Sequence, residues 1–406
     1  MKHTISILLL ISALACVSCT NPAEQRICFF GSSVCRGVGA DSLHGYAWQY
    51  TESLPKGWSS VNLSVDGNDT YDLLARFDRD LLPDDSRFVF IGLSLGNEGL
   101  HESGEAAVLS YKENLQTLVR KIRELGRIPV VALSYPRADF NPVDYEDLLN
   151  TNLEMMQWAV PTVAFLGALD DGHGRWADEC WNHQDIYHPD TYGHTLLCSA
   201  IPPTLFRALA EGKPLPQRVK AQLSSAVETS TVETEYIQSL QQPSPQQPSP
   251  HQPSPHQPSP QQPSPHQPSQ HQSSSHQPSP QQSSVNHIHV SFTPEPGLTS
   301  YTLSYTSADT VYTVVHSAAR NLTWYYVNDE CRSEFEDDDV PASFTVEGNN
   351  LSDLFFFRTP LSSREVKALV EGAMLRSSLE IYAPLTGDNP SANLAQTLNT
   401  ITIKPF

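Results

Sequence analysis

Basic residues are scarce in this chain. Its 406 residues include only 25 Lys and Arg against 45 Asp and Glu, which gives a formal net charge of −20. Proteins that bind nucleic acid do so mainly through basic contacts to phosphate. The composition therefore argues against a nucleic-acid partner and against attachment to anionic lipid by charge, and the acidity is explained by solubility alone.

Long hydrophobic runs are also missing after the first residues. No later segment reaches about 18 apolar residues, the length expected of a membrane-spanning helix. Residues 1–19 combine a basic start, a short apolar stretch and small residues before Cys19, a pattern typical of an export signal. Cys19 resembles the lipid-modified cysteine of a bacterial lipoprotein, with Cys16 as a rival acceptor. We expect an exported protein of the cell envelope, as an outer-membrane or surface lipoprotein, with plain secretion as the alternative.

Cysteine beyond this segment is limited to an odd set of five residues. One or two disulfides can form in an oxidising compartment, for example between Cys180 and Cys198, but the spacing does not determine the pairing. Cys28 and Cys35 flank a glycine-bounded turn, and we expect both to be buried thiols rather than a bridge.

Residues 24–212 alternate apolar runs with amphipathic stretches, which predicts a parallel sheet covered by helices on both faces. The expected strands are 26–30, 59–64, 87–95, 127–135 and 161–169. The expected helices are 106–126, 143–160 and 191–212, the last with a Pro-Pro interruption. Ligands of such sheets bind outside the C-terminal ends of the strands.

The second half of the chain differs in composition. Residues 213–285 form a linker whose QPSP repeats cannot bury a core and are expected to be disordered and extended. Residues 286–406 predict a β-rich α+β domain of unknown role that can bind glycan or protein. Its expected strands are 287–292, 300–307, 310–317, 322–327, 342–348 and 353–359, followed by a helix over 362–375 with a Ser362–Glu365 capping box.

Three short segments of the first half carry residues suited to acyl transfer. Ser33 lies between Gly31 and Gly37, where a turn can expose its hydroxyl. Asp185 precedes His188 by three residues, so its carboxylate can orient the imidazole. Asn97 follows an apolar strand and offers a neutral donor for an oxyanion.

These segments resemble the conserved blocks of the SGNH (GDSL-type) hydrolases. GSSVCRG is similar to the first block, NLSVDGNDT to the second, SLGNEG to the third and DIYHPDTYGH to the last. The resemblance covers residues 24–212 and implies a flavodoxin-like three-layer α/β/α fold without metal or organic cofactor. It assigns a Ser33–His188–Asp185 triad and an oxyanion hole made by the Ser33 and Gly67 N–H groups and the Asn97 amide.

The chain departs from the family's blocks at four positions. Ser32 and Glu98 each replace Asp, Asp190 replaces Asn, and Leu95 stands where a Gly is expected, with Gly96 beside it.

Three other arrangements compete for the same or nearby residues. Ser94 fits the GxSxG elbow of α/β-hydrolases, although no helix pattern follows it at once. A zinc site could draw on nearby Cys and His side chains: Cys180, His183, His188, His194 and Cys198. The acidic run 334–339 could hold calcium, but a solvated loop accounts for it as well.

The combined pattern predicts a carboxylic ester hydrolase. We expect O-acyl groups, acetyl above all, on extracellular carbohydrate as substrates. Lipid esters, as cleaved by a lysophospholipase or arylesterase, are the alternative within the enzyme class. A surface glycan-binding or adhesion protein with a degenerate hydrolase domain is the alternative outside it.

Overall fold

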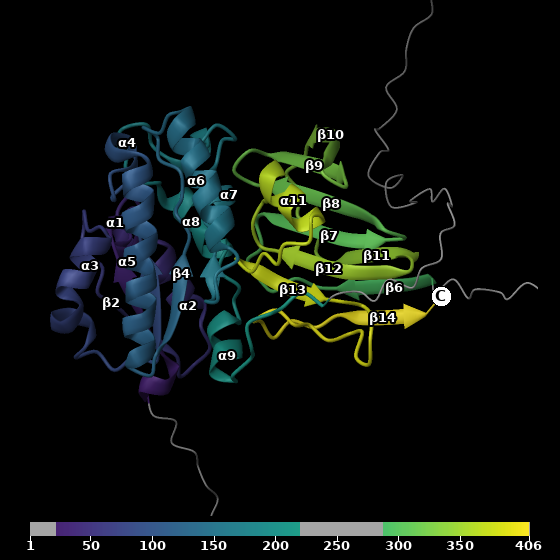
Figure 1. Ribbon diagram of the computed structural model, residues 1–406, viewed down its shortest axis with the longest axis horizontal. Helices are drawn as coiled ribbons and strands as arrows, with labels where there is room; N and C mark the ends of the chain where they lie inside the picture. The colour runs from purple at the N-terminus through teal and green to yellow at the C-terminus, as the bar shows by residue number, and fades with distance from the viewer. Residues whose placement is uncertain (1–21, 220–286, 406) are drawn as a thin grey trace, which may run out of the picture.

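The computed structural model describes residues 22–219, here called the N-terminal unit, and residues 287–405, the C-terminal unit. The expected export signal with Cys16 and Cys19 and the QPSP repeats lie outside the described residues. Figure 1 shows the two units side by side, the first rich in helices and the second in strands.

The N-terminal unit is built on a five-stranded parallel sheet, as the sequence predicts. Its strands are β1 (Arg26–Gly31), β2 (Ser59–Asn62), β3 (Phe88–Gly92), β4 (Ile128–Ala132) and β5 (Thr162–Val163). Their order, β2-β1-β3-β4-β5, is that of flavodoxin-like doubly wound sheets. The expected strand 161–169 is wrong beyond its start, because Leu166–Leu169 forms the short helix α7.

Helices cover both faces of this sheet because alternate strand residues point to opposite sides. Cys28 and Phe30 of β1 pack toward α3 (Thr70–Arg76), α5 (Glu105–Glu124) and α6 (Pro142–Met155). Ile27 and Phe29 pack on the other side, toward α2 (Tyr46–Ser53), α8 (Thr191–Ser199) and α9 (Leu205–Ala210). The short helices are α1 (Ser33–Arg36) and α4 (Leu100–Ser103). The three-layer α/β/α architecture is therefore confirmed.

The C-terminal unit consists of two antiparallel sheets. Its strands are β6 (His287–Phe292), β7 (Tyr301–Ser307), β8 (Thr310–Ser317), β9 (Leu322–Val327), β10 (Glu330–Glu336), β11 (Phe344–Asn349), β12 (Leu351–Phe357), β13 (Leu379–Ala383) and β14 (Thr402–Pro405). The larger sheet has the order β10-β9-β8-β7-β12-β13 and the smaller one β11-β6-β14. The predicted helix is α11 (Ser363–Val370), and its Ser362–Glu365 capping box is present.

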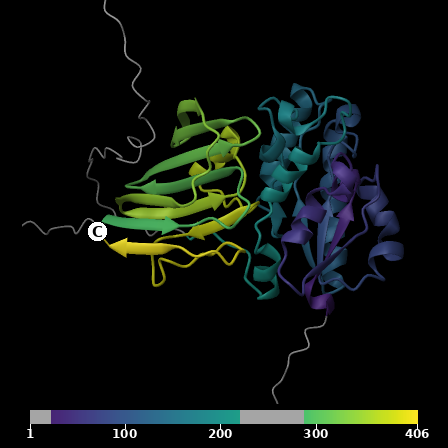
Figure 2. The same cartoon turned by 180° about the vertical axis from the view of Figure 1, so that it is seen from behind.

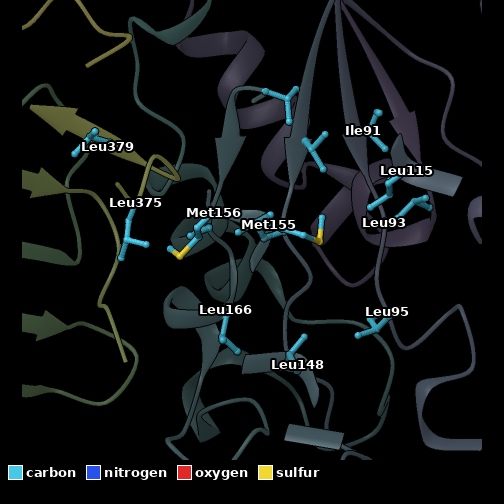
Figure 3. Close-up of a cluster of buried hydrophobic side chains, with 14 of the residues drawn as sticks. Ile91, Leu93, Leu95, Leu115, Leu148, Met155, Met156, Leu166, Leu375 and Leu379 are labelled. Atoms are coloured by element: carbon cyan, nitrogen blue, oxygen red, sulfur yellow. The ribbon is translucent and has the colours of Figure 1, made fainter. Parts of the chain in front are cut away.

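The two units share one hydrophobic core. Figure 3 shows Met155, Met156 and Leu166 of the N-terminal unit beside Leu375 and Leu379 of the C-terminal unit. Figure 2 shows the junction from behind, with the teal helices of the N-terminal unit against the green and yellow strands of the C-terminal unit. The two domains predicted on either side of the linker thus contact each other through apolar side chains.

Hydrogen bonds reinforce this junction at the edge of the parallel sheet. The Ser378 backbone N–H donates to the carbonyl of Thr162 over 3.3 Å, and the Ser378 hydroxyl accepts from the Ala164 N–H at 2.9 Å. The Thr162 and Ser377 hydroxyls lie 2.7 Å apart. The C-terminal unit therefore covers the otherwise free edge of β5.

The described cysteines are all free thiols. Cys28 and Cys35 are buried as expected, and no bridge joins Cys180 to Cys198. No helix within residues 22–219 and 287–405 is long and apolar enough to cross a membrane.

Candidate active site

Ser33 lies at the point where β1 turns into the short helix α1. The turn is tight: a Cβ on Gly31 would lie 2.0 Å from the carbonyl oxygen of Gly92, so only glycine fits there. The Ser32 N–H donates to the same Gly92 oxygen at 3.1 Å. The Ser33 hydroxyl is thus held at the C-terminal end of the sheet in a residue that is 7% exposed.

His188 reaches Ser33 from the loop that precedes α8. Its Nε2 lies 2.8 Å from the Ser33 Oγ, and its Nδ1 lies 2.6 Å from the Asp185 Oδ2. The structure therefore brings Ser33, His188 and Asp185 into one hydrogen-bonded row. In that row the imidazole can take the Ser33 proton while the carboxylate holds its other N–H.

The Asp185 carboxylate is suited to remain ionised. Partial burial raises its pKa, but hydrogen bonds from His188 and from the Tyr187 N–H outweigh this effect. The pKa of Asp185 consequently lies below its usual range. An ionised carboxylate favours the imidazole tautomer with hydrogen on Nδ1, which leaves Nε2 free to accept a proton from Ser33.

The loop that carries Asp185 and His188 is fixed at its C-terminal end. Asp190 caps α8, since its side chain accepts from the Gly193 N–H at 2.9 Å, and its own N–H donates to the Cys180 carbonyl. Asp190 therefore serves as the N-cap of α8. Gly39 lets the chain pass close by, because a Cβ there would lie 2.0 Å from the Pro189 oxygen.

His194 supports the same region from beneath and is fully buried. Its Nδ1 accepts from the Tyr46 N–H at 3.2 Å and its Nε2 donates to the Val38 carbonyl at 2.9 Å. Burial lowers the pKa of His194 to about 4, so the ring is neutral near pH 7. With both nitrogens engaged, His194 has no free lone pair for a metal.

Gly67 and Asn97, the residues assigned to the oxyanion hole, belong to two loops that are joined to each other. The Asn97 Nδ2 donates to the carbonyl of Asn68 over 3.0 Å, which leaves its second hydrogen unused. Gly67 has a φ of +75°, and a Cβ there would meet no atom within 4 Å. Both donors therefore lie in loops that follow strands β2 and β3, at the same edge as Ser33.

Arg76 joins the Gly67 loop to the nucleophile strand and was not predicted from the sequence. Its guanidinium donates to the Gly31 and Leu63 carbonyls and to the Asn68 Oδ1. It is only 5% exposed. Because one planar cation bonds both the end of β1 and the loop after β2, it fixes the spacing of these two segments at the rim of the site.

Glu98 explains another departure from the family's blocks. Its carboxylate accepts from the N–H and the hydroxyl of Thr70 at the start of α3, at 3.0 and 2.6 Å. Burial raises the pKa of Glu98. The longer side chain thus ties the Asn97 loop to the helix that follows the Gly67 loop.

The Ser94 elbow and the zinc site do not assemble within the described residues. Ser94 is 1% exposed and its hydroxyl accepts from the Gly96 N–H; within the described residues no imidazole bonds to it. In the same parts of the chain, the three side chains grouped closely enough to hold a metal ion are Asp337, Asp338 and Asp339; the Cys and His side chains considered for zinc form no such group. These aspartates follow β10 in a largely exposed loop.

Comparison with known proteins gives structural matches only. No family model and no curated protein matches the sequence. The fold is similar to that of a protein described as lipolytic and of the G-D-S-L family from Desulfitobacterium hafniense DCB-2. That pair has 17% identity and a TM-score of 0.37, and the match covers 43% of this chain and 97% of that one.

Two further solved structures are similar to a comparable extent. An acetylxylan esterase from Geobacillus stearothermophilus has 17% identity and a TM-score of 0.35, with 43% of this chain and 91% of that chain covered. A GDSL-like lipase from Bacteroides thetaiotaomicron VPI-5482 has 14% identity and a TM-score of 0.37, with 47% and 89% covered.

Proposed function

We propose that this protein is a serine ester hydrolase of the SGNH type. The single observation that carries the proposal is the continuous row from the Ser33 Oγ through His188 to Asp185, with 2.8 and 2.6 Å between successive atoms. These are normal hydrogen-bond distances for a nucleophile, its base and the group that orients the base. The four sequence blocks add support, since each contributes a residue at this edge of the sheet.

The proposed reaction follows from these positions. His188 Nε2 takes the Ser33 proton as the Ser33 oxygen attacks the ester carbonyl carbon, and the carbonyl electron pair moves onto its oxygen. When the carbonyl re-forms, the bond to the leaving alcohol breaks and the alcohol receives the proton from His188. Water, deprotonated by His188, then attacks the acyl-Ser33 ester; the bond from the acyl carbon to the Ser33 oxygen breaks, that oxygen takes the proton back from His188, and the carboxylic acid is released.

The negative oxygen of both tetrahedral intermediates needs hydrogen-bond donors. Ser33 is the first residue of α1, so its N–H has no partner within the helix. The Gly67 N–H and the unused Asn97 Nδ2 hydrogen complete the proposed set. Asp185 stabilises the imidazolium that forms in each step, and no resident metal or organic cofactor takes part in the proposed scheme.

For the substrate, we propose O-acyl groups, particularly acetyl, on carbohydrate outside the cell. The expected export signal supports a substrate in the envelope or beyond it, and a lipid on Cys19 would keep the enzyme at the surface. Esters of lipids are the competing substrates. Comparing acetate release from acetylated polysaccharide with fatty-acid release from lysolipid distinguishes the two.

A fluorophosphonate probe tests the proposed enzyme class. We expect the full-length chain to be labelled at Ser33, with labelling lost in Ser33→Ala and retained in Ser94→Ala. A folded chain that neither reacts with the probe nor hydrolyses any ester would contradict the proposal and favour a binding protein. The altered block residues that motivated that alternative stand beside Asn97, and one of them, Glu98, has a structural partner in Thr70.

A further inference from the structure

Tyr187 lies between the two triad residues of the same loop and is unusually exposed for an aromatic residue. The side chain follows Ile186, and 51% of Tyr187 is accessible to solvent. Its backbone is fixed, because its N–H donates to the Asp185 Oδ1 at 2.8 Å. The ring is therefore presented at the mouth of the site, immediately before His188 in the chain.

A buried cation supports this ring from one side. The Arg137 guanidinium lies 4.6 Å from the centroid of the Tyr187 ring, and Arg137 itself is 8% exposed. Its Nε donates to the Asp139 Oδ1 at 2.9 Å, so the carboxylate holds the guanidinium plane. Cation–π attraction of this kind is strongest where the cation is shielded from water.

Arg137 also contacts the loop that carries the proposed oxyanion donor. A Cβ on Gly96 would lie 2.5 Å from the Arg137 Cδ and 2.7 Å from its Nη1, so the absence of a side chain at Gly96 makes room for the arginine. Asn97 is the next residue. The guanidinium thus fixes the Tyr187 ring relative to Asn97 as well as to His188.

The exposed residues that precede Tyr187 in the loop are mainly polar. Asn182, His183 and Gln184 precede Asp185 on the same loop and are exposed, whereas the neighbouring exposed apolar side chain is Ile186. Amide and imidazole groups bond to hydroxyls, and a flat aromatic face packs against the apolar face of a sugar ring. A lipid chain would instead require a continuous apolar surface.

We propose that Tyr187, held in place by Arg137, is the platform on which the sugar ring of an acylated carbohydrate stacks, and is a specificity-determining residue. This inference rests on the proposed esterase function. One face of the ring is covered by the guanidinium, so the opposite face receives the sugar while the ester reaches Ser33. Asn182, His183 and Gln184 supply hydrogen bonds to the sugar hydroxyls.

The test compares two substrates of one enzyme: an acetylated xylo-oligosaccharide and ethyl acetate, which has no ring. Tyr187→Ala should lower the ratio of their kcat/KM values (oligosaccharide to ethyl acetate) by about two- to tenfold, mainly through KM, as expected for the loss of one aromatic packing contact. Tyr187→Phe keeps the ring and should preserve most of the ratio. Arg137→Lys, which lacks the planar fork, should give a smaller decrease than Tyr187→Ala.

Tyr192 provides the matched control. It is an α8 tyrosine with 42% exposure, and no guanidinium lies over its ring among the described contacts. Tyr192→Ala should leave the ratio unchanged, and all variants should react with a fluorophosphonate at the wild-type rate if the triad is intact. An unchanged ratio in Tyr187→Ala, or an equal decrease in Tyr192→Ala, overturns this inference alone. A wild-type chain that hydrolyses neither ester and resists the probe overturns the proposed function instead.

Discussion

Arg358 of the C-terminal unit donates its Nε to the carbonyl oxygen of Ser199 over 2.7 Å, at the end of helix α8. The start of that helix follows directly after the His188 loop. The same guanidinium pairs with the Glu380 carboxylate at 2.6 Å, and the two side chains are 1% and 0% exposed. A residue far along the chain thus bonds to the element that positions the proposed catalytic base.

Removing this guanidinium should destabilise the whole molecule. In Arg358→Ala the Glu380 carboxylate stays buried without its partner, which typically costs about 3–5 kcal/mol. Chemical denaturation followed by circular dichroism measures the loss. Arg364→Ala is the control, because its bond to Glu146 also crosses the junction but is solvent-exposed and should change stability by less than ~1 kcal/mol. Equal losses of unfolding free energy in the two variants would contradict the inference that the buried Arg358–Glu380 pair matters more than the exposed one.

A chain that ends at residue 219 should fold poorly. It would expose Met155, Met156 and Leu166, which now pack against the C-terminal unit, and would leave the edge of β5 unpaired. We expect lower solubility and a lower melting temperature than in the full chain. Deleting only the repeats 241–284 provides the control and should leave the melting temperature unchanged. If the chain that ends at residue 219 is as stable as this control, the two units fold independently and the prediction is wrong.

Replacing the proposed oxyanion donor should lower kcat more than it affects KM. Loss of one such donor typically costs about 10²- to 10³-fold in rate. We expect this from Asn97→Ala, and a larger loss from Asn97→Asp, because a carboxylate would repel the developing negative charge. Steady-state kinetics on 4-nitrophenyl acetate measures both. A kcat within threefold of wild type in Asn97→Ala would exclude Asn97 as a donor.

Protonation of the buried Glu365 carboxyl should contribute stability that is lost as the pH rises from about 4.5 to 7, opposite in sign to the contribution of His194, whose pKa burial lowers to about 4. Burial raises the pKa of Glu365 from 4.5 to about 7, and that of Asp170 is raised by burial too. In this window the folded protein holds a proton that the unfolded chain has released, so raising the pH favours unfolding. Glu365→Gln keeps an oxygen that accepts from the Ser362 N–H and should remove this pH-dependent contribution to stability. The control Glu371→Gln changes an exposed residue just after α11 and should leave the contribution in place.

The sequence predicts those elements whose apolar pattern has a single interpretation. β1, β3 and β4 are apolar runs of strand length, and the helix over 106–126 has a clear amphipathic period. The segment 161–169 is ambiguous, since a short apolar run can be buried as strand or helix, and tertiary packing turns Leu166–Leu169 into a helix. β10 was missed because its sequence, ECRSEFE, is mostly charged and exposed, as suits a strand at the edge of a sheet.

The residues of the candidate site also fall into two groups, those that the sequence predicts and those that only the structure shows. Ser33, Asp185 and His188 stand in short motifs whose chemistry is legible within a few residues. Arg76 bonds to backbone carbonyls and Arg137 lies over the Tyr187 ring, and only the fold brings these groups together. The sequence around a single arginine does not show that its side chain is buried. The junction between the units depends on Arg358, which directly follows β12, and on Glu380 of β13; in the sequence both look like ordinary surface charges.

The direction of β1 determines how the nucleophile would be oriented in a protein anchored through its N-terminal segment. This strand runs from Arg26, close to where the described chain begins at Pro22, to Gly31 beside Ser33. Six residues of strand span about 20 Å. A lipid on Cys19 would therefore hold the protein by the rim opposite to the nucleophile, turning the reactive hydroxyl outward, toward polymers in the medium and away from the bilayer that carries the anchor.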